Sequence, residues 1–280
     1  MLNQIKTTIL LTVLTVILLI IGQLLGGISG LTIAFVIALF INFISYWFSD
    51  KIVLFMYRAK PASEEEYPKL HSMVKDLANR SNLPKPRLYI IKVNHANAFA
   101  TGRNPKHSAV AVTQGILDLL SEDELKGVLA HELSHIKNRD ILISTIAAVI
   151  AGAIAYLTYF ARFGAMFGGR DRQGSANLFQ ILLLAILAPI IATLIRLSIS
   201  RSRELMADES GAKLIKNSKP LADALVKLHS SASRNPIRMG NEATAHMFIV
   251  NPFSASALTA LFSTHPPVNQ RVGKLRAMRF

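Results

Sequence analysis

The chain has 280 residues, of which 51% are hydrophobic and only 17% are charged, a balance that favours a membrane protein over an ordinary soluble globule. The formal net charge of +14 would suggest a nucleic-acid partner on a soluble chain. No nucleic-acid-binding motif accompanies it, so we expect no such partner and assign the basic residues to the cytoplasmic flanks of membrane helices. The absence of cysteine excludes disulfides and cysteine-ligated zinc, so a tightly held metal must use His, Asp and Glu.

Two apolar stretches near the N-terminus, residues 7–25 and 31–48, are each close to the about 20 residues that cross a bilayer. An uncharged turn at residues 26–30 joins them, and the second stretch closes on Tyr46 and Trp47, aromatic residues typical of a membrane interface. The first stretch is longer than the apolar region of a signal peptide. We therefore predict an N-terminal transmembrane hairpin over residues 1–49.

Two further apolar stretches, residues 141–160 and 178–195, predict a second transmembrane hairpin over residues 141–196 and bring the bundle to about four spans. Pro189 lies inside the fourth stretch, and membrane helices tolerate such a kink. A pair of buried helices in a soluble domain is the alternative interpretation of these two stretches.

Basic residues set the expected orientation. Lys51, Arg58 and Lys60 follow the second span, which places that end of the hairpin in the cytoplasm. Two more crossings return the chain to the same side, so residues 50–140 and 197–280 are expected to be cytoplasmic and to form one domain together. Their basic residues outweigh the arginines in the loop between the third and fourth spans.

The cytoplasmic part has the pattern of an α+β domain. Residues 63–79 are predicted to be a helix, with Ser63 before an acidic run that suits a helix N-terminus. Residues 88–93 and 108–113 are predicted to be strands, with Gly102 in their connection. We expect residues 109–113 to form the edge of the sheet.

A capping box formed by Ser121 and Glu124 opens the next predicted helix. This helix carries His131-Glu132-Leu133-Ser134-His135, and positions four apart lie on one face, so both imidazoles can reach one zinc ion. Glu132 can take a proton from a water that the metal activates. Three fixed residues arise by chance in about one such chain in a hundred. A helix that carries two histidines without a metal is therefore the alternative.

A catalytic zinc has three protein ligands and one open position. Glu204 and Asp208 follow the fourth apolar stretch and are again four residues apart. We expect Glu204 to be the third ligand and Asp208 to accept a hydrogen bond from the far nitrogen of a ligand histidine, His131 in the first place. An ordinary charged helix face, shared with Arg201 and Arg203, is the alternative.

The residues His131-Glu-Leu-Ser-His-Ile-Lys-Asn-Arg-Asp140 and Ser202-Arg-Glu-Leu-Met-Ala-Asp208, each next to a hydrophobic hairpin, resemble the gluzincin type of zinc peptidase. They are similar to the HtpX family of heat-shock membrane proteases, with the CAAX-prenyl proteases as distant relatives; Leu205 stands where many members carry an aromatic residue. The resemblance implies an integral cytoplasmic-membrane endopeptidase that degrades damaged or misassembled membrane proteins. It also implies that Glu132 is the general base and that His131, His135 and Glu204 bind one zinc ion.

Peptide hydrolysis requires a donor for the oxyanion besides the metal. We expect His265 to supply it, with Arg271 as second candidate, whereas a turn residue before Pro266 is the alternative role for His265. Two other classes of function are open at this stage. A catalytically silent, zinc-binding membrane scaffold would not require Glu132, and a transporter would carry ionisable residues within its spans, which these apolar stretches essentially lack.

Overall fold

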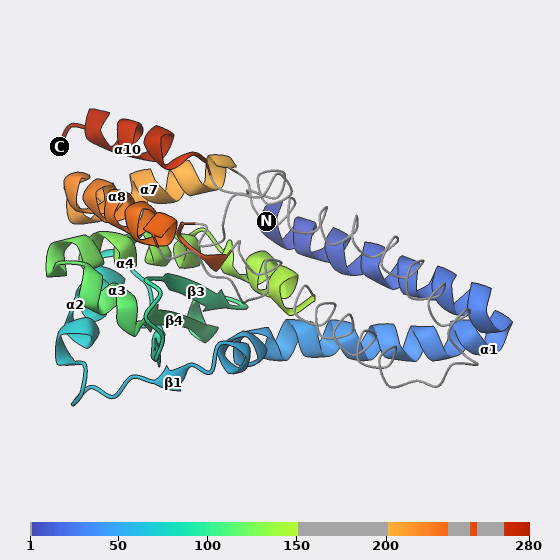
Figure 1. The fold of residues 1–280 in the computed structure, drawn as a ribbon. Helices are drawn as coiled ribbons and strands as arrows, with labels where there is room; N and C mark the ends of the chain where they lie inside the picture. The colour runs from blue at the N-terminus through green and yellow to red at the C-terminus, as the bar shows by residue number, and fades with distance from the viewer. Residues whose placement is uncertain (1, 151–200, 235–246, 251–265) are drawn as a thin grey trace.

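The computed structural model describes residues 2–150, 201–234, 247–250 and 266–280. It combines a long helical hairpin with a mixed α+β domain, and the hairpin extends away from that domain (Figure 1). In the described part of the chain two helices are long and apolar enough to cross a membrane, Thr7–Leu24 and Gly26–Met56. The mixed α+β class and the presence of two membrane-capable helices near the N-terminus are confirmed.

The hairpin is the element α1 (Leu2–Met56), which reverses direction at two glycines. Gly27 has φ 56° and ψ −139°, a backbone conformation open to glycine and strained for other residues. Next to the turn the backbones of the two arms are in close contact. A Cβ added at Gly30 would lie 2.2 Å from the carbonyl oxygen of Gly22. Farther along, Asn42 donates a hydrogen bond of 2.8 Å to the hydroxyl of Thr15.

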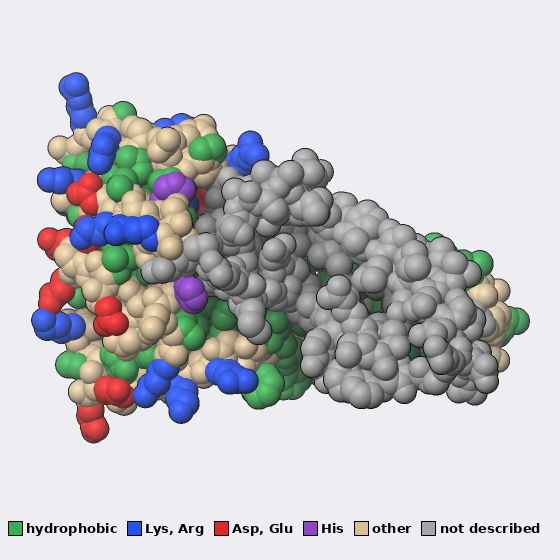
Figure 2. Space-filling view, in the orientation of Figure 1, with side chains coloured by type: hydrophobic (Ala, Val, Ile, Leu, Met, Phe, Trp, Pro, Cys, Tyr) green, Lys and Arg blue, Asp and Glu red, His purple; other side chains and the backbone are tan. Residues whose placement is uncertain are grey.

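Many large apolar side chains of the hairpin are exposed, for example Leu24, Ile28 and Phe40 at 80%, 81% and 65%. Apolar side chains are visible at the hairpin's tip in Figure 2, far from the charged surface of the α+β domain. Such a surface is stable in lipid rather than in water. The helix Ile141–Ile150, where the third predicted span begins, packs Ile143 and Ile146 against Leu10 of the first arm. The rest of this span and the whole of the fourth lie outside the described residues.

Within the described residues the sheet has four strands in the order β1-β2-β4-β3: β1 (Lys60–Pro61), β2 (Arg87–Ile91), β4 (Ser108–Thr113) and β3 (Ala98–Gly102). β2 and β4 are parallel, and β3 pairs antiparallel with β4 with Ala100 opposite Val110. The prediction that residues 109–113 form the edge is therefore wrong. The segment around Gly102, predicted as a connection, is part of the edge strand β3, and β4 lies inside the sheet.

Six of the described helices build the main core with this sheet. They are α2 (Pro68–Arg80), α3 (Gln114–Leu119), α4 (Glu122–Lys137), α7 (Arg201–Ile215), α8 (Lys219–Arg234) and α10 (Val268–Ala277), and a short 3-10 turn, η1 (Pro105–His107), precedes β4. Of the six, α3 and α4 contact the strands, and the others pack around α4 or on one another. α2 begins later than predicted, because Ser63–Glu66 form a turn closed by the Ser63 hydroxyl and Pro68 occupies the first helical turn.

α4 lies at the centre of the domain and begins with the predicted capping box. The Ser121 hydroxyl accepts from the amide of Glu124, and the Glu124 carboxylate accepts from the amide of Ser121. Lys227 of α8 donates to the same carboxylate at 2.8 Å. Leu129 and Leu133, on the face away from the histidines, are fully buried, as their spacing predicts.

Candidate metal centre

α4 and α7 approach each other so closely that glycine is required between them. A Cβ added at Gly211 of α7 would lie 2.9 Å from the backbone nitrogen of His131 and 3.1 Å from the carbonyl carbon of Ala130. Backbone atoms cannot move aside as a side chain can, so the contact excludes any larger residue without a shift of the helices. This approach brings Glu204, two turns earlier on α7, over the histidine face of α4.

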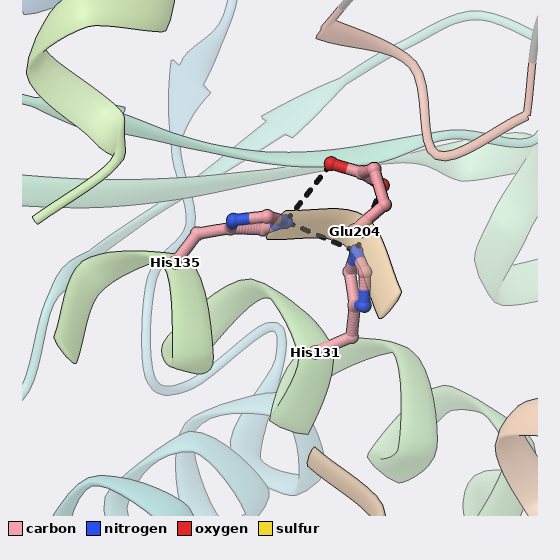
Figure 3. A group of neighbouring side chains, drawn as sticks. All are labelled: His131, His135 and Glu204. Carbon is pink, nitrogen blue, oxygen red and sulfur yellow. Dashed lines mark hydrogen bonds and ion pairs between the residues drawn. The ribbon is translucent and has the colours of Figure 1, made fainter. Parts of the chain in front are cut away.

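His131, His135 and Glu204 converge on one point from these two helices (Figure 3). The Nε2 atoms of the two histidines lie 3.2 Å apart, and Glu204 oxygens lie 3.7 Å from Nε2 of His131 and 3.5 Å from Nε2 of His135. Zinc bound tetrahedrally at its usual distances separates its ligand atoms by about 3.3–3.5 Å. The three side chains therefore fit the metal site that their sequence spacing predicts.

The far nitrogens of the two histidines face carboxylates. Nδ1 of His131 lies 2.9 Å from Oδ1 of Asp208, as expected from the sequence, and Nδ1 of His135 lies 3.3 Å from Oδ2 of Asp140. A carboxylate at Nδ1 favours the tautomer that leaves the Nε2 lone pair unprotonated and directed at the cluster. The converging atoms are then all acceptors, an arrangement that a cation stabilises.

The charge around the cluster also favours a cation. Burial alone would lower the pKa of His135, but the carboxylates of Asp140, Glu204 and Glu132 outweigh it and raise this pKa to about 9. Without a metal these carboxylates therefore draw a proton onto His135. The negative charge of the same carboxylates attracts a divalent cation, which must displace that proton to bind.

Asp208 is buried and held by a guanidinium. Arg271 of α10, 1% exposed, donates from Nε and Nη2 to the two oxygens of Asp208, each at 2.7 Å. Burial alone would raise the pKa of Asp208, but Arg271 and then His131 hold this pKa below its ordinary value. Arg271 also donates from Nη1 to the carbonyl of Ile249 at 2.9 Å. Arg271 therefore orients Asp208, and its Nη1 also lies 3.8 Å from Oε2 of Glu204.

Glu132 lies beside the ligands and is held by the edge strand. Its Oε2 accepts a hydrogen bond of 2.8 Å from the backbone amide of Ala100 in β3. Burial raises the pKa of Glu132, and the nearby histidines offset this only in part. A carboxylate with a raised pKa is suited to take a proton near neutral pH and to return it later.

Asp140 is the residue of this centre to which the sequence reasoning gave no role. It follows α4 in a turn where Arg139 has φ 57°, and its amide donates to the carbonyl of His135 at 3.0 Å. The sequence signal that could have indicated this role is a carboxylate five residues after a ligand histidine, just past the end of the helix. His265, the expected oxyanion donor, lies outside the described residues.

The profile of Peptidase family M48 matches residues 64–279. A protein of Pyrococcus furiosus named Protease HtpX homolog is 55% identical over 97% of this chain and 94% of its own length. Another of that name, from Syntrophobacter fumaroxidans, is 50% identical over 99% of both chains.

The fold is also similar to the crystal structure of S. mikatae Ste24p, with a TM-score of 0.53 and 18% identity. The match covers 98% of this chain and 65% of that protein, so the chain spans about two thirds of its length. The residues that match family M48, 64–279, include α4 with both histidines, α7 with Glu204 and Asp208, and α10 with Arg271. This chain therefore belongs to peptidase family M48 and is a membrane-bound metalloprotease.

Proposed function

We propose that the protein is a zinc endopeptidase of the cytoplasmic membrane that hydrolyses misfolded or damaged membrane proteins as part of protein quality control under stress. Its active site faces the cytoplasm. The chain consists of two transmembrane hairpins, residues 1–49 and 141–196, and one catalytic domain built from residues 50–140 and 197–280. The observation that carries this proposal is the convergence of His131, His135 and Glu204 beside a held carboxylate, Glu132.

In this proposal His131, His135 and Glu204 hold one zinc ion, which when bound supplies a Lewis acid for the scissile carbonyl and lowers the pKa of water. Asp208 and Asp140 fix the two imidazoles in the ligating tautomer. Glu132 takes a proton from the attacking water and delivers it to the leaving amine. His265 stays the proposed oxyanion donor.

The sheet edge supports an extended substrate. Among the described strands β3 is the outer one on the side of α4, and its Ala100 amide holds Glu132. A peptide added to this edge as a further strand would carry a carbonyl past Glu132. Main-chain pairing reads little of the side-chain sequence, which suits a protease that degrades many unfolded segments.

The test is cleavage of an unfolded protein by the purified full chain in detergent, with zinc content measured on the same samples. Glu132→Gln should lower the cleavage rate by about 10²–10⁴-fold at unchanged zinc content. Glu209→Gln, the same change at an exposed position of α7, is the matched control and should cleave like wild type.

Two outcomes would contradict the proposal. If wild type and Glu132→Gln both bind zinc and neither cleaves the substrate, the protein is a zinc-binding scaffold. If both cleave equally well, Glu132 is not the base.

A further inference from the structure

A cavity of about 710 Å³ lies where the hairpin meets the α+β domain. Its walls come from both ends of α1 (Thr7, Tyr46), from the segment before β4 (Arg103, Lys106) and from the end of α4 (Lys137, Arg139). The volume is within the range of about 300–1,000 Å³ typical of small-molecule sites. Among the described residues, none that belongs to the proposed catalytic machinery lines it.

The charge of the cavity has one sign. Four basic side chains line it and none of its lining residues is acidic. In the part of the chain that the structure describes, no carboxylate lies within ion-pairing distance of Lys106, Lys137 or Arg139, which are all partly or fully exposed. Cations gathered without counter-charges repel one another, so the site favours an anion.

The cavity also lies at the level where a membrane would end. Thr7 begins one membrane-capable helix, and Tyr46 lies beside Trp47 near the end of the apolar stretch 31–48 within the other. The guanidinium carbon of Arg103 is 4.5 Å from the centre of the Trp47 ring, and its Nη1 donates to the Trp47 carbonyl. Aromatic rings with basic side chains at this depth are typical of the headgroup region. Leu11 and Leu142 supply apolar lining next to the hydroxyls.

One of the cations occupies a costly backbone position. Arg139 has φ 57°, where glycine or asparagine is usual after a helix. Lys137 and Arg139 would also be favourable beside the carbonyl end of α4 without any ligand. That role predicts an effect on stability alone and says nothing of Lys106, which lies on another segment.

From the cavity, its charge and its depth, we propose that this site binds the phosphate diester of an anionic membrane lipid, with Lys106, Lys137 and Arg139 contacting the phosphate. The acyl chains would leave along the apolar arms of α1. The lipid would link the hairpin to the α+β domain at the membrane surface, a function that does not depend on peptide hydrolysis.

Trp47, the chain's single tryptophan, gives a direct readout because Arg103 of the cavity lies against its ring. Purified full chain in neutral detergent is titrated with short-chain phosphatidylglycerol, short-chain phosphatidylcholine and inorganic phosphate while Trp47 fluorescence is recorded. We expect a saturable change with phosphatidylglycerol. Phosphatidylcholine and inorganic phosphate should require at least about tenfold higher concentrations.

The variant is the triple substitution Lys106→Gln, Lys137→Gln and Arg139→Gln, which should raise the half-saturating phosphatidylglycerol concentration at least about tenfold. The control is Lys75→Gln, Lys219→Gln and Arg279→Gln, three exposed cations outside the cavity, and it should titrate like wild type. Equal titration of the two triple variants would overturn the site. Equal binding of phosphatidylcholine or of inorganic phosphate would overturn the assignment to an anionic lipid. A triple variant that melts earlier but binds normally would overturn the lipid site and leave Lys137 and Arg139 only the role at the end of α4.

Discussion

His131 and His135 share one helix and face one point, but different parts of the chain hold them. The carboxylate beside His131 comes from α7 and is itself held by Arg271 of α10. The carboxylate beside His135 comes from the turn that ends α4. The His131 side is thus a long-range assembly, whereas the carboxylate of the His135 side is local to α4 and has a looser contact with α7, 3.8 Å from Nη1 of Arg203. Changes on the first side should therefore disturb the fold together with the site, and changes on the second mainly the site.

The largest expected effect on stability is at Arg271. Arg271→Met removes the guanidinium from a buried pair and should lower the free energy of unfolding by about 3–5 kcal/mol. Arg276→Met, on the same helix but in an exposed pair with Asp223, should change it by less than about 1 kcal/mol. Urea unfolding in detergent measures both, and equal effects would contradict the long-range assembly.

The stability that Arg271→Met loses should depend on pH in a defined direction. The folded protein holds the pKa of Asp208 below its ordinary value of 3.8, so the pair's contribution is present above this value and lost as pH falls through the folded pKa. The difference between Arg271→Met and wild type should therefore shrink at the most acid pH at which wild type is still folded.

A smaller effect is expected where α7 meets α4. Gly211→Ala sets a methyl group against the backbone of His131 and should destabilise by about 1–3 kcal/mol and weaken zinc binding. Gly273→Ala is the control, because nothing lies within 4 Å of its added Cβ, and in the interior of α10 it should stabilise by up to about 1 kcal/mol. Thermal unfolding and zinc titration test both; a Gly211→Ala protein as stable as wild type would show that the helices can separate freely.

The smallest effect on stability is expected on the local side. Asp140→Asn removes the charge beside Nδ1 of His135 and should weaken zinc affinity by about 10–100-fold. Its loss of stability without zinc should be less than that of Arg271→Met. Asp118→Asn, an exposed carboxylate of α3, should leave zinc affinity unchanged. Competition with a zinc-binding dye measures the affinities, and an Asp140→Asn protein with wild-type affinity would remove Asp140 from the centre.

The difference between local and long-range contacts also explains which parts of the centre could be predicted from the sequence. Helical spacing places His131 and His135, and Glu204 and Asp208, on shared faces, and the capping box of Ser121 and Glu124 marks where α4 begins. Arg271 could not be assigned to Asp208, because no local pattern links residues 63 positions apart. The edge strand was missed for a related reason. The strand at residues 98–102 is short, and its side chains apart from Phe99 are small. The pairing partners of a strand are set by the whole sheet.

The two hydrogen bonds from Arg271 to Asp208 have a consequence for the order in which the centre forms during synthesis. The ribosome delivers α4 with both histidines first, α7 later and α10 later still. A growing chain thus carries the complete histidine motif before Arg271 has been made. At that stage Asp208 has no guanidinium to hold it beside His131. Maturation of the centre waits for the segment that carries α10, so a newborn chain beside other nascent proteins is not yet an assembled protease.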